Sequence, residues 1–368
     1  MRKVCQERPR GYGCLIPMKP FLLFCLSATG FAATPATPEA ALKFNDAKPQ
    51  AYNLTMRASL IDPRCKAHPE VGFVLEAAGK AVDTEKACVD TRVPSRGQLV
   101  IWLMGHSQPL ADKVNSYGLH YIQVAYAREW FGKLNTEPLN ESQHLGNIRL
   151  EATTGLDASK SIDIPAPDSM KERAYQFVKA LTKTNPPGRW DFFLTKDGQA
   201  LDWEKVIISG ASHGATSSAR FAIAQKCARV VMFCGPRDQF EDWQGLAPAT
   251  PANRFFGYSH VLDGGWSGDH YPRSWLLLGL NKFGPIVNTD EAKAPYGNSR
   301  RLITQFDVKG DANKAHGFVQ VNKSPPKDAK GVALQEDVWH YLFTSPIDEV
   351  GKPVPAEPAT RMNLRKQK

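Results

Sequence analysis

One serine in this sequence stands in a setting that suits nucleophilic catalysis. Residues 206–215 read VIISGASHGA, so a β-branched run leads directly into Gly210-Ala211-Ser212-His213-Gly214. A serine displayed on a sharp strand-to-helix turn has strained backbone angles, and glycines two residues to either side avoid collisions with neighbouring backbone. The first N–H groups of the following helix would face whatever reacts at this serine. The stretch therefore predicts a nucleophilic serine between a strand and a helix.

The serine needs a base, because its hydroxyl is a weak nucleophile near neutral pH. In this arrangement an acid and then a histidine follow the serine, each beyond the carboxyl end of a strand. His316 and His340 both follow the last expected strand, 302–306. We expect His316 to be the base, since it lies in a loop beside a glycine. His340 lies between two aromatic residues of an expected helix, where it would pack.

The acid that orients the base has two candidates. Asp263 follows the expected strand 254–262, directly before the strand of the histidine, and Asp238 follows the expected strand 229–234. We favour Asp263 and keep Asp238 as the alternative acid. An Asp238 that is not the acid could form a surface ion pair with Arg237.

Two N–H donors must stabilise the oxyanion that forms when the serine attacks a carbonyl. One donor should be His213, the residue after the nucleophile. The other should come from the loop that follows Met104, at His106 or Ser107. The ring of His213 could also line the pocket or take no part.

A compact group of histidines and aspartates raises the question of a metal ion. It consists of His260, Asp263, Asp269 and His270. Their spacings match no standard zinc pattern. We therefore expect no metal.

Alternating strands and helices must position these residues. Continuous hydrophobicity over 99–104 indicates a strand covered on both faces, as in a parallel sheet. Further strands are expected at 54–60, 71–75 and 121–125, and helices at 168–184, 215–226, 275–280 and 334–343. The alternation predicts one α/β domain over 51–345 with a doubly wound, mostly parallel sheet. Residues 127–167 and 237–253 look loop-rich and could cap a pocket.

From about Leu99 to Phe343 the chain resembles the α/β-hydrolase superfamily. Within that region, 203–214, 233–238, 257–263 and 301–316 resemble a group of secreted bacterial hydrolases of unassigned substrate. The resemblance implies a triad of Ser212, Asp263 and His316 and no cofactor. Gly105-His106-Ser107-Gln108 replaces the usual His-Gly oxyanion loop, which leaves the second donor open.

The N-terminus predicts export. Five basic residues precede the short apolar run 21–26, and Gly30-Phe31-Ala32 fits a cleavage site, so we expect a signal peptide at 1–32. A start at Met18 would give a shorter signal of the same kind. Residues 33–50 look like a flexible leader and 346–368 like a basic tail. The mature chain should be periplasmic or secreted, without stable insertion in a membrane.

Charge and cysteine content narrow the interpretation further. Cleavage would remove five basic residues and one acidic residue, lowering the formal net charge from +9 to +5. Because the sequence before the tail contains no run of basic residues, we do not expect nucleic-acid binding. Cys65 and Cys88 flank a turn-rich stretch, so we expect a disulfide between them. Cys227 and Cys234 should stay buried thiols, because an extended strand holds them too far apart.

The sequence thus predicts an exported serine hydrolase that cleaves a carboxylic ester, small or polymeric, through an acyl-enzyme. A non-catalytic binding protein on the same fold is the alternative, and a metal-dependent hydrolase comes third. The acyl and alcohol preference and the oligomeric state stay open.

Overall fold

A mostly parallel sheet, in which β4 (Thr84–Asp90) near one edge runs in the opposite direction to its neighbours, forms the framework of the chain. The structure, a computed structural model, describes residues 42–134, 143–238, 243–268, 270–321 and 324–356. The expected signal peptide, most of the leader and the end of the tail lie outside these residues.

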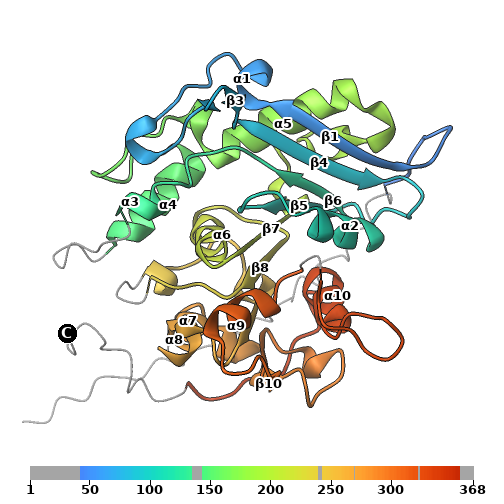
Figure 1. Cartoon of the computed structure of the whole chain (residues 1–368), viewed down its shortest axis with the longest axis vertical. Helices are drawn as coiled ribbons and strands as arrows, with labels where there is room; N and C mark the ends of the chain where they lie inside the picture. The colour runs from blue at the N-terminus through green and yellow to red at the C-terminus, as the bar shows by residue number, and fades with distance from the viewer. Residues whose placement is uncertain (1–41, 135–142, 239–242, 269, 322–323, 357–368) are drawn as a thin grey trace, which may run out of the picture. The chain divides into compact units, whose positions relative to one another are not determined.

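The strand order of the sheet brings the expected site residues to one edge. In the described part of the chain it has nine strands, in the order β1-β4-β6-β5-β7-β8-β9-β11-β10 (Figure 1). The antiparallel pairs join β1 (Ala51–Arg57) to β4 (Thr84–Asp90) and β4 to β6 (His120–Gln123). The remaining pairs are parallel and involve β5 (Leu99–Trp102), β7 (Val206–Ala211), β8 (Arg229–Phe233), β9 (Phe255–His260), β11 (Arg301–Thr304) and β10 (Ile286–Asn288). The carboxyl ends of these strands therefore share one edge.

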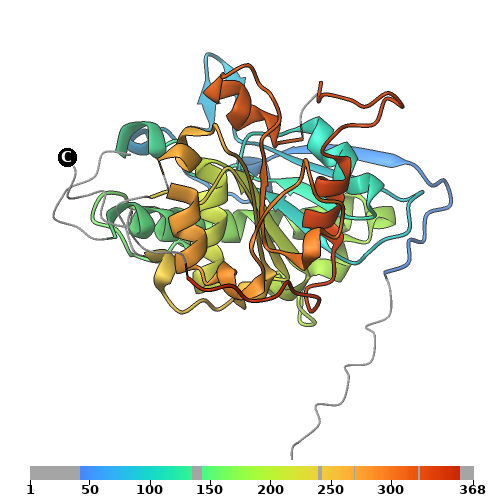
Figure 2. The ribbon, with the colours of Figure 1, turned by 90° about the horizontal axis from the view of Figure 1, so that it is seen from below.

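Helices lie on both sides of the sheet (Figure 2). The longer ones are α2 (Gln108–Ser116), α4 (His144–Thr154), α5 (Met170–Thr184), α6 (His213–Ala224), α8 (His270–Leu277) and α10 (Glu336–Thr344). Short helices α1 (Ala58–Ile61), α3 (Phe131–Leu134), α7 (Gly264–Ser267) and α9 (Ala312–Phe318) and the hairpin of β2 (Glu76–Ala77) and β3 (Lys80–Ala81) complete the set. Every residue of β5 is buried, as the continuous hydrophobicity predicted, and every residue of β7 is buried as well. The expected fold class, a doubly wound and mostly parallel α/β sheet, is confirmed.

One expected strand is wrong, and one segment expected to be loop-rich contains a helix. Residues 71–75 form no strand; a 3₁₀ turn, Pro69–Val71, ends there, and β4 supplies the next strand of the sheet. The segment 127–167 contains the eleven-residue helix α4 rather than loop alone. Eight of its residues are buried, so it shows no apolar stripe from which a helix could be recognised.

The expected disulfide between Cys65 and Cys88 is also wrong, since both thiols are free and buried. Cys88 lies on β4 and its sulfur contacts Gln108 of α2. Glu85 lies three residues earlier on the strand, so its side chain points to the opposite face. On that face lies Arg173 of α5. Burial raises the pKa of both Glu85 and Cys65, and the charge of Arg173 opposes that rise. The sheet therefore separates the two sulfurs. Cys227 and Cys234 are buried thiols, as expected.

No helix in the described residues is both long and apolar enough to cross a membrane.

Candidate active site

The turn at Ser212 has the geometry that its sequence predicts. β7 ends at Ala211, α6 begins at His213, and Ser212 between them has φ 53° and ψ −114°. An L-residue rarely adopts a positive φ, so the surrounding structure must hold this conformation. A Cβ on Gly210 would lie 2.3 Å from the carbonyl carbon of Gly214, and a Cβ on Gly214 would lie 2.8 Å from the sulfur of Met104. The turn requires glycine at 210, where a Cβ would collide with backbone, whereas a side chain at 214 would first have to displace Met104.

Asp263 and His316 meet beyond the ends of neighbouring strands. Asp263 follows β9 and caps α7, accepting a hydrogen bond from the N–H of Gly265 at 2.7 Å. His316 lies on α9, not in the loop that the sequence suggested, and Asp311 caps that helix. The Nδ1 atom of His316 lies 2.5 Å from Oδ2 of Asp263. The Asp263 side chain is 2% exposed and the His316 side chain 35% exposed.

The surroundings of Asp263 favour its ionised form. Burial opposes ionisation most strongly. Hydrogen bonds from His316 and Gly265 and the charge of a protonated His316 together outweigh it, so the pKa of Asp263 lies below its ordinary value. A buried carboxylate in this state can fix the orientation of the imidazole and stabilise its protonated form.

The end of β8 lies between Ser212 and His316. The N–H of Ser212 donates to the carbonyl of Phe233 at 2.8 Å. The thiol of the next residue, Cys234, donates to the carbonyl of His316 at 3.2 Å. The side chain of Ser212 is half-buried and makes no hydrogen bond with the described residues. The elbow and the Asp263–His316 pair thus occupy the same edge of the sheet.

Asp238, the alternative acid, has a different partner. Its carboxylate accepts two hydrogen bonds from Arg149 of α4, at 2.7 and 2.8 Å, and one from Nε1 of Trp243 at 3.1 Å. Both side chains of this ion pair are at most 2% exposed. The surface ion pair with Arg237 that the sequence suggested is therefore replaced by a buried pair with Arg149.

Arg149 also holds the residue that follows the nucleophile. Its Nη1 donates to Nδ1 of His213 at 2.8 Å, to the carbonyl of His213 at 3.2 Å and to Ser217 at 3.0 Å. The ring of His213 packs against Trp130 and Phe131, with centroids 5.1 and 4.6 Å away. Burial, and then the charges of Arg149 and Arg128, hold the pKa of His213 well below its ordinary value. The neutral ring is thus held in one orientation next to the turn at Ser212.

The N–H groups near Ser212 differ in their availability. His213 begins α6, so its own N–H has no partner within the helix. The N–H of Ser107 donates to the hydroxyl of Tyr121 at 3.3 Å, and its side chain caps α2. The N–H of His106 makes no hydrogen bond with the described residues, so of the two expected second donors it is the one that is not already engaged.

A cavity of about 390 Å³ adjoins the loop of His106. Phe73, Val74, Val82 and Tyr126 supply apolar walls. The charged residues of the lining are Lys86 and the ion pair of Arg128 with Glu129, 3.2 Å apart. This combination of an apolar surface with a few polar groups is typical of small-molecule sites.

The residues that could hold a metal differ from those expected. His260 uses both ring nitrogens on backbone groups, the carbonyl of Phe306 at 2.8 Å and the N–H of Leu262 at 3.0 Å, and Asp269 lies outside the described residues. Ligand atoms of Cys234, Asp263 and His316 lie within 4.8 Å of one another. Burial and the nearby Asp263 raise the pKa of the Cys234 thiol well above its ordinary value.

Sequence reasoning missed Arg149, Trp130 and Phe131. All three lie in the segment 127–167, which was expected to be loop-rich. Arg149 is a charged residue in a helix without an apolar stripe. Its role depends on contacts with His213 and Asp238, which are 64 and 89 residues away in the sequence, so no local pattern indicates it.

The strand order, the strained serine elbow and the acid and histidine beyond later strands define an α/β-hydrolase fold. No protein-family model matches the sequence, and no curated protein matches it either.

Solved structures give matches at low identity. One is an α/β serine hydrolase without a lid from Xanthomonas campestris, with 12% identity and a TM-score of 0.32 over 72% of this chain and 92% of that one. Esterase B from Lactobacillus rhamnosis has 10% identity and a TM-score of 0.39 over 79% and 85%. A carboxylesterase from Lactobacillus plantarum has 13% identity and a TM-score of 0.34 over 70% and 88%.

Proposed function

We propose that this chain is a serine hydrolase that cleaves carboxylic esters through an acyl-enzyme. The observation that carries the proposal is the contact between Asp263 and His316 at the edge of the sheet that also holds the strained Ser212. These are the three residue types that acyl transfer requires, in the chain order that this fold uses.

In the proposed mechanism, Nε2 of His316 takes the proton of the Ser212 hydroxyl as its oxygen attacks the ester carbonyl. Asp263 holds Nδ1 of the imidazolium. The N–H groups of His213 and His106 stabilise the oxyanion. His316 then protonates the departing alcohol, and water, activated by the same histidine, releases the acid and restores Ser212.

The cavity beside His106 is the proposed subsite for part of the substrate. Its apolar walls suit a hydrocarbon or aromatic group of the ester. A panel of esters that differ in acyl length and in charge would identify the preferred substrate.

A fluorophosphonate probe tests the nucleophile. It should label the wild-type chain at Ser212 and should not label the Ser212→Ala variant. The matched control is Ser116→Ala, which removes an exposed hydroxyl on α2. If Ser212→Ala is labelled as fast as the wild type, the nucleophile is elsewhere. An unlabelled wild type would favour a binding protein.

We also propose that the chain is exported and that cleavage removes residues 1–32. The basic residues, the apolar run and the small residues at 30–32 support this proposal. Intact-mass measurement of the protein from a secreting host should show a start near Ala33. A mass that includes residues 1–32 in the host's periplasm and medium would refute it.

A further inference from the structure

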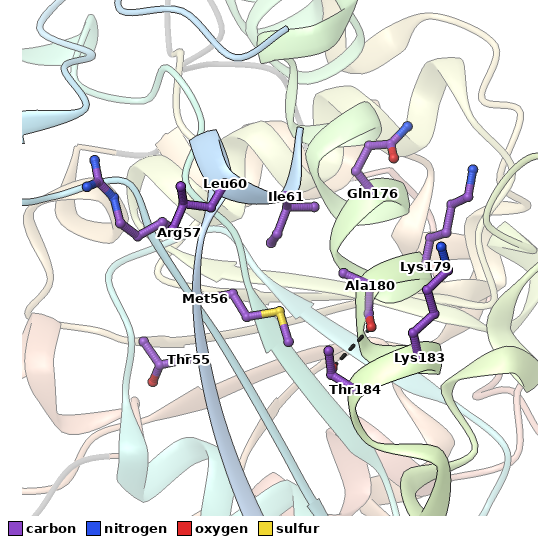
Figure 3. Close-up of a pocket in the computed structure, with 10 residues that line it drawn as sticks. All are labelled: Thr55, Met56, Arg57, Leu60, Ile61, Gln176, Lys179, Ala180, Lys183 and Thr184. Atoms are coloured by element: carbon purple, nitrogen blue, oxygen red, sulfur yellow. Dashed lines mark hydrogen bonds between the residues drawn. The ribbon is translucent and has the colours of Figure 1, made fainter. Parts of the chain in front are cut away.

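A second cavity, of about 640 Å³, lies between the edge strand β1 and helix α5 (Figure 3). None of its lining residues belongs to the candidate active site. Its volume falls in the range of known ligand pockets, about 300–1,000 Å³. We call it the β1–α5 groove.

The floor of the β1–α5 groove is apolar. Met56, Ile61 and Ala180 are only half-buried, and Leu60 is 77% exposed at the rim. Figure 3 shows Leu60 and Ile61 on one side of the groove and Ala180 on the other. A hydrocarbon chain in the groove would remove these side chains from water.

The rim of the groove is cationic. Lys179 and Lys183 are one turn apart on α5 and extend from the same side of the helix (Figure 3). Neither forms an ion pair with a described residue, and the lining contains no carboxylate. Arg57, the third cation, already pairs with Asp83 at 2.9 Å and Glu76 at 3.2 Å. Like charges four residues apart repel one another, so an anion between the two lysines would be stabilising.

We propose that the β1–α5 groove binds an amphipathic carboxylate of the fatty-acid type. The carboxylate lies between Lys179 and Lys183, and the hydrocarbon chain covers Met56, Leu60 and Ile61. The proposal is independent of the proposed hydrolase activity, because the groove shares no residue with the candidate active site.

Calorimetric titration with dodecanoate below its micelle concentration tests this site. The Ser212→Ala chain is used, so that no hydrolysis contributes heat. One equivalent should bind, and the double variant Lys179→Gln/Lys183→Gln should bind at least tenfold more weakly. Leu60→Ser should also weaken binding several-fold. Lys330→Gln/Lys352→Gln, which removes two exposed lysines elsewhere, should change the affinity less than twofold.

Three results would overturn the proposal. The first is that dodecanoate does not bind, or that it binds equally well to a Lys179→Gln/Lys183→Gln variant whose melting temperature shows that the variant is folded. The second is equal binding of dodecyltrimethylammonium, which has the opposite charge. The third is lysine-dependent binding to anionic phospholipid vesicles without binding of monomeric dodecanoate, which would make the groove a membrane-surface contact.

Discussion

Replacing Arg149 by lysine tests whether Arg149 positions the turn at Ser212 and His213 for catalysis. The guanidinium of Arg149 makes two hydrogen bonds to Asp238 and further bonds to His213 and Ser217, all within 3.2 Å. Lysine keeps the charge but has no planar fork, so it can satisfy Asp238 or His213 and not both. Breaking a buried ion pair completely costs about 3–5 kcal/mol. Because the charge remains, we expect Arg149→Lys to lower the free energy of unfolding by about 2–3 kcal/mol.

The catalytic cost of this substitution has a separate origin. The N–H of His213 is a proposed oxyanion donor, and loss of one such donor lowers kcat by about 10²–10³. Arg149→Lys loosens that donor without removing it, so kcat should fall by about tenfold to a hundredfold while KM changes little. Urea unfolding measures the loss of stability, and steady-state ester hydrolysis measures kcat and KM.

A second buried arginine provides the control. Arg173 is also 1% exposed and pairs with Asp168 at 2.6 Å, but it does not contact the first turn of α6. Arg173→Lys should lower stability by a similar amount and leave kcat of the folded protein unchanged. Equal losses of kcat in both variants, or an unchanged kcat in Arg149→Lys, would refute the positioning role of Arg149.

Three further predictions concern the acid, its titration and the cysteines. Asp263→Asn should lower kcat by about 10⁴, whereas Asp238→Asn should mainly lower thermal stability; steady-state kinetics showing the reverse would make Asp238 the acid. Because the pKa of Asp263 is lowered in the folded state, its ionised form contributes stability at pH values above its unfolded pKa of about 3.9, and this contribution is lost as the pH falls through the lower folded pKa. Urea titrations between pH 2 and 6 should therefore show a steeper loss of stability in the wild type than in Asp263→Asn, and parallel curves would contradict this. Alkylation of the unfolded protein without reductant should modify both Cys65 and Cys88, and a peptide containing both in disulfide linkage would show that the sheet does not keep them apart.

The elements with strong local patterns could be predicted from the sequence. Continuous hydrophobicity identified β5, the β-branched run at 206–208 identified β7, and Gly210 and Gly214 identified the turn at Ser212. Each pattern reflects a constraint within about ten residues. The pairing of Asp263 with His316 spans 53 residues and was expected for a different reason, because adjacent parallel strands end at the same edge. The sequence analysis missed β10, which lies between β9 and β11 in the chain but at the edge of the sheet.

Other features depend on the tertiary structure alone. Whether Cys65 can reach Cys88 is decided by the face of β4 on which each sulfur lies, and spacing along the chain does not contain that information. The partner of Asp238 is likewise decided by α4, which is buried on nearly all sides and so lacks the stripe that marks an amphipathic helix. A buried charge must find its partner wherever the fold places one, and Arg149 comes from 89 residues away.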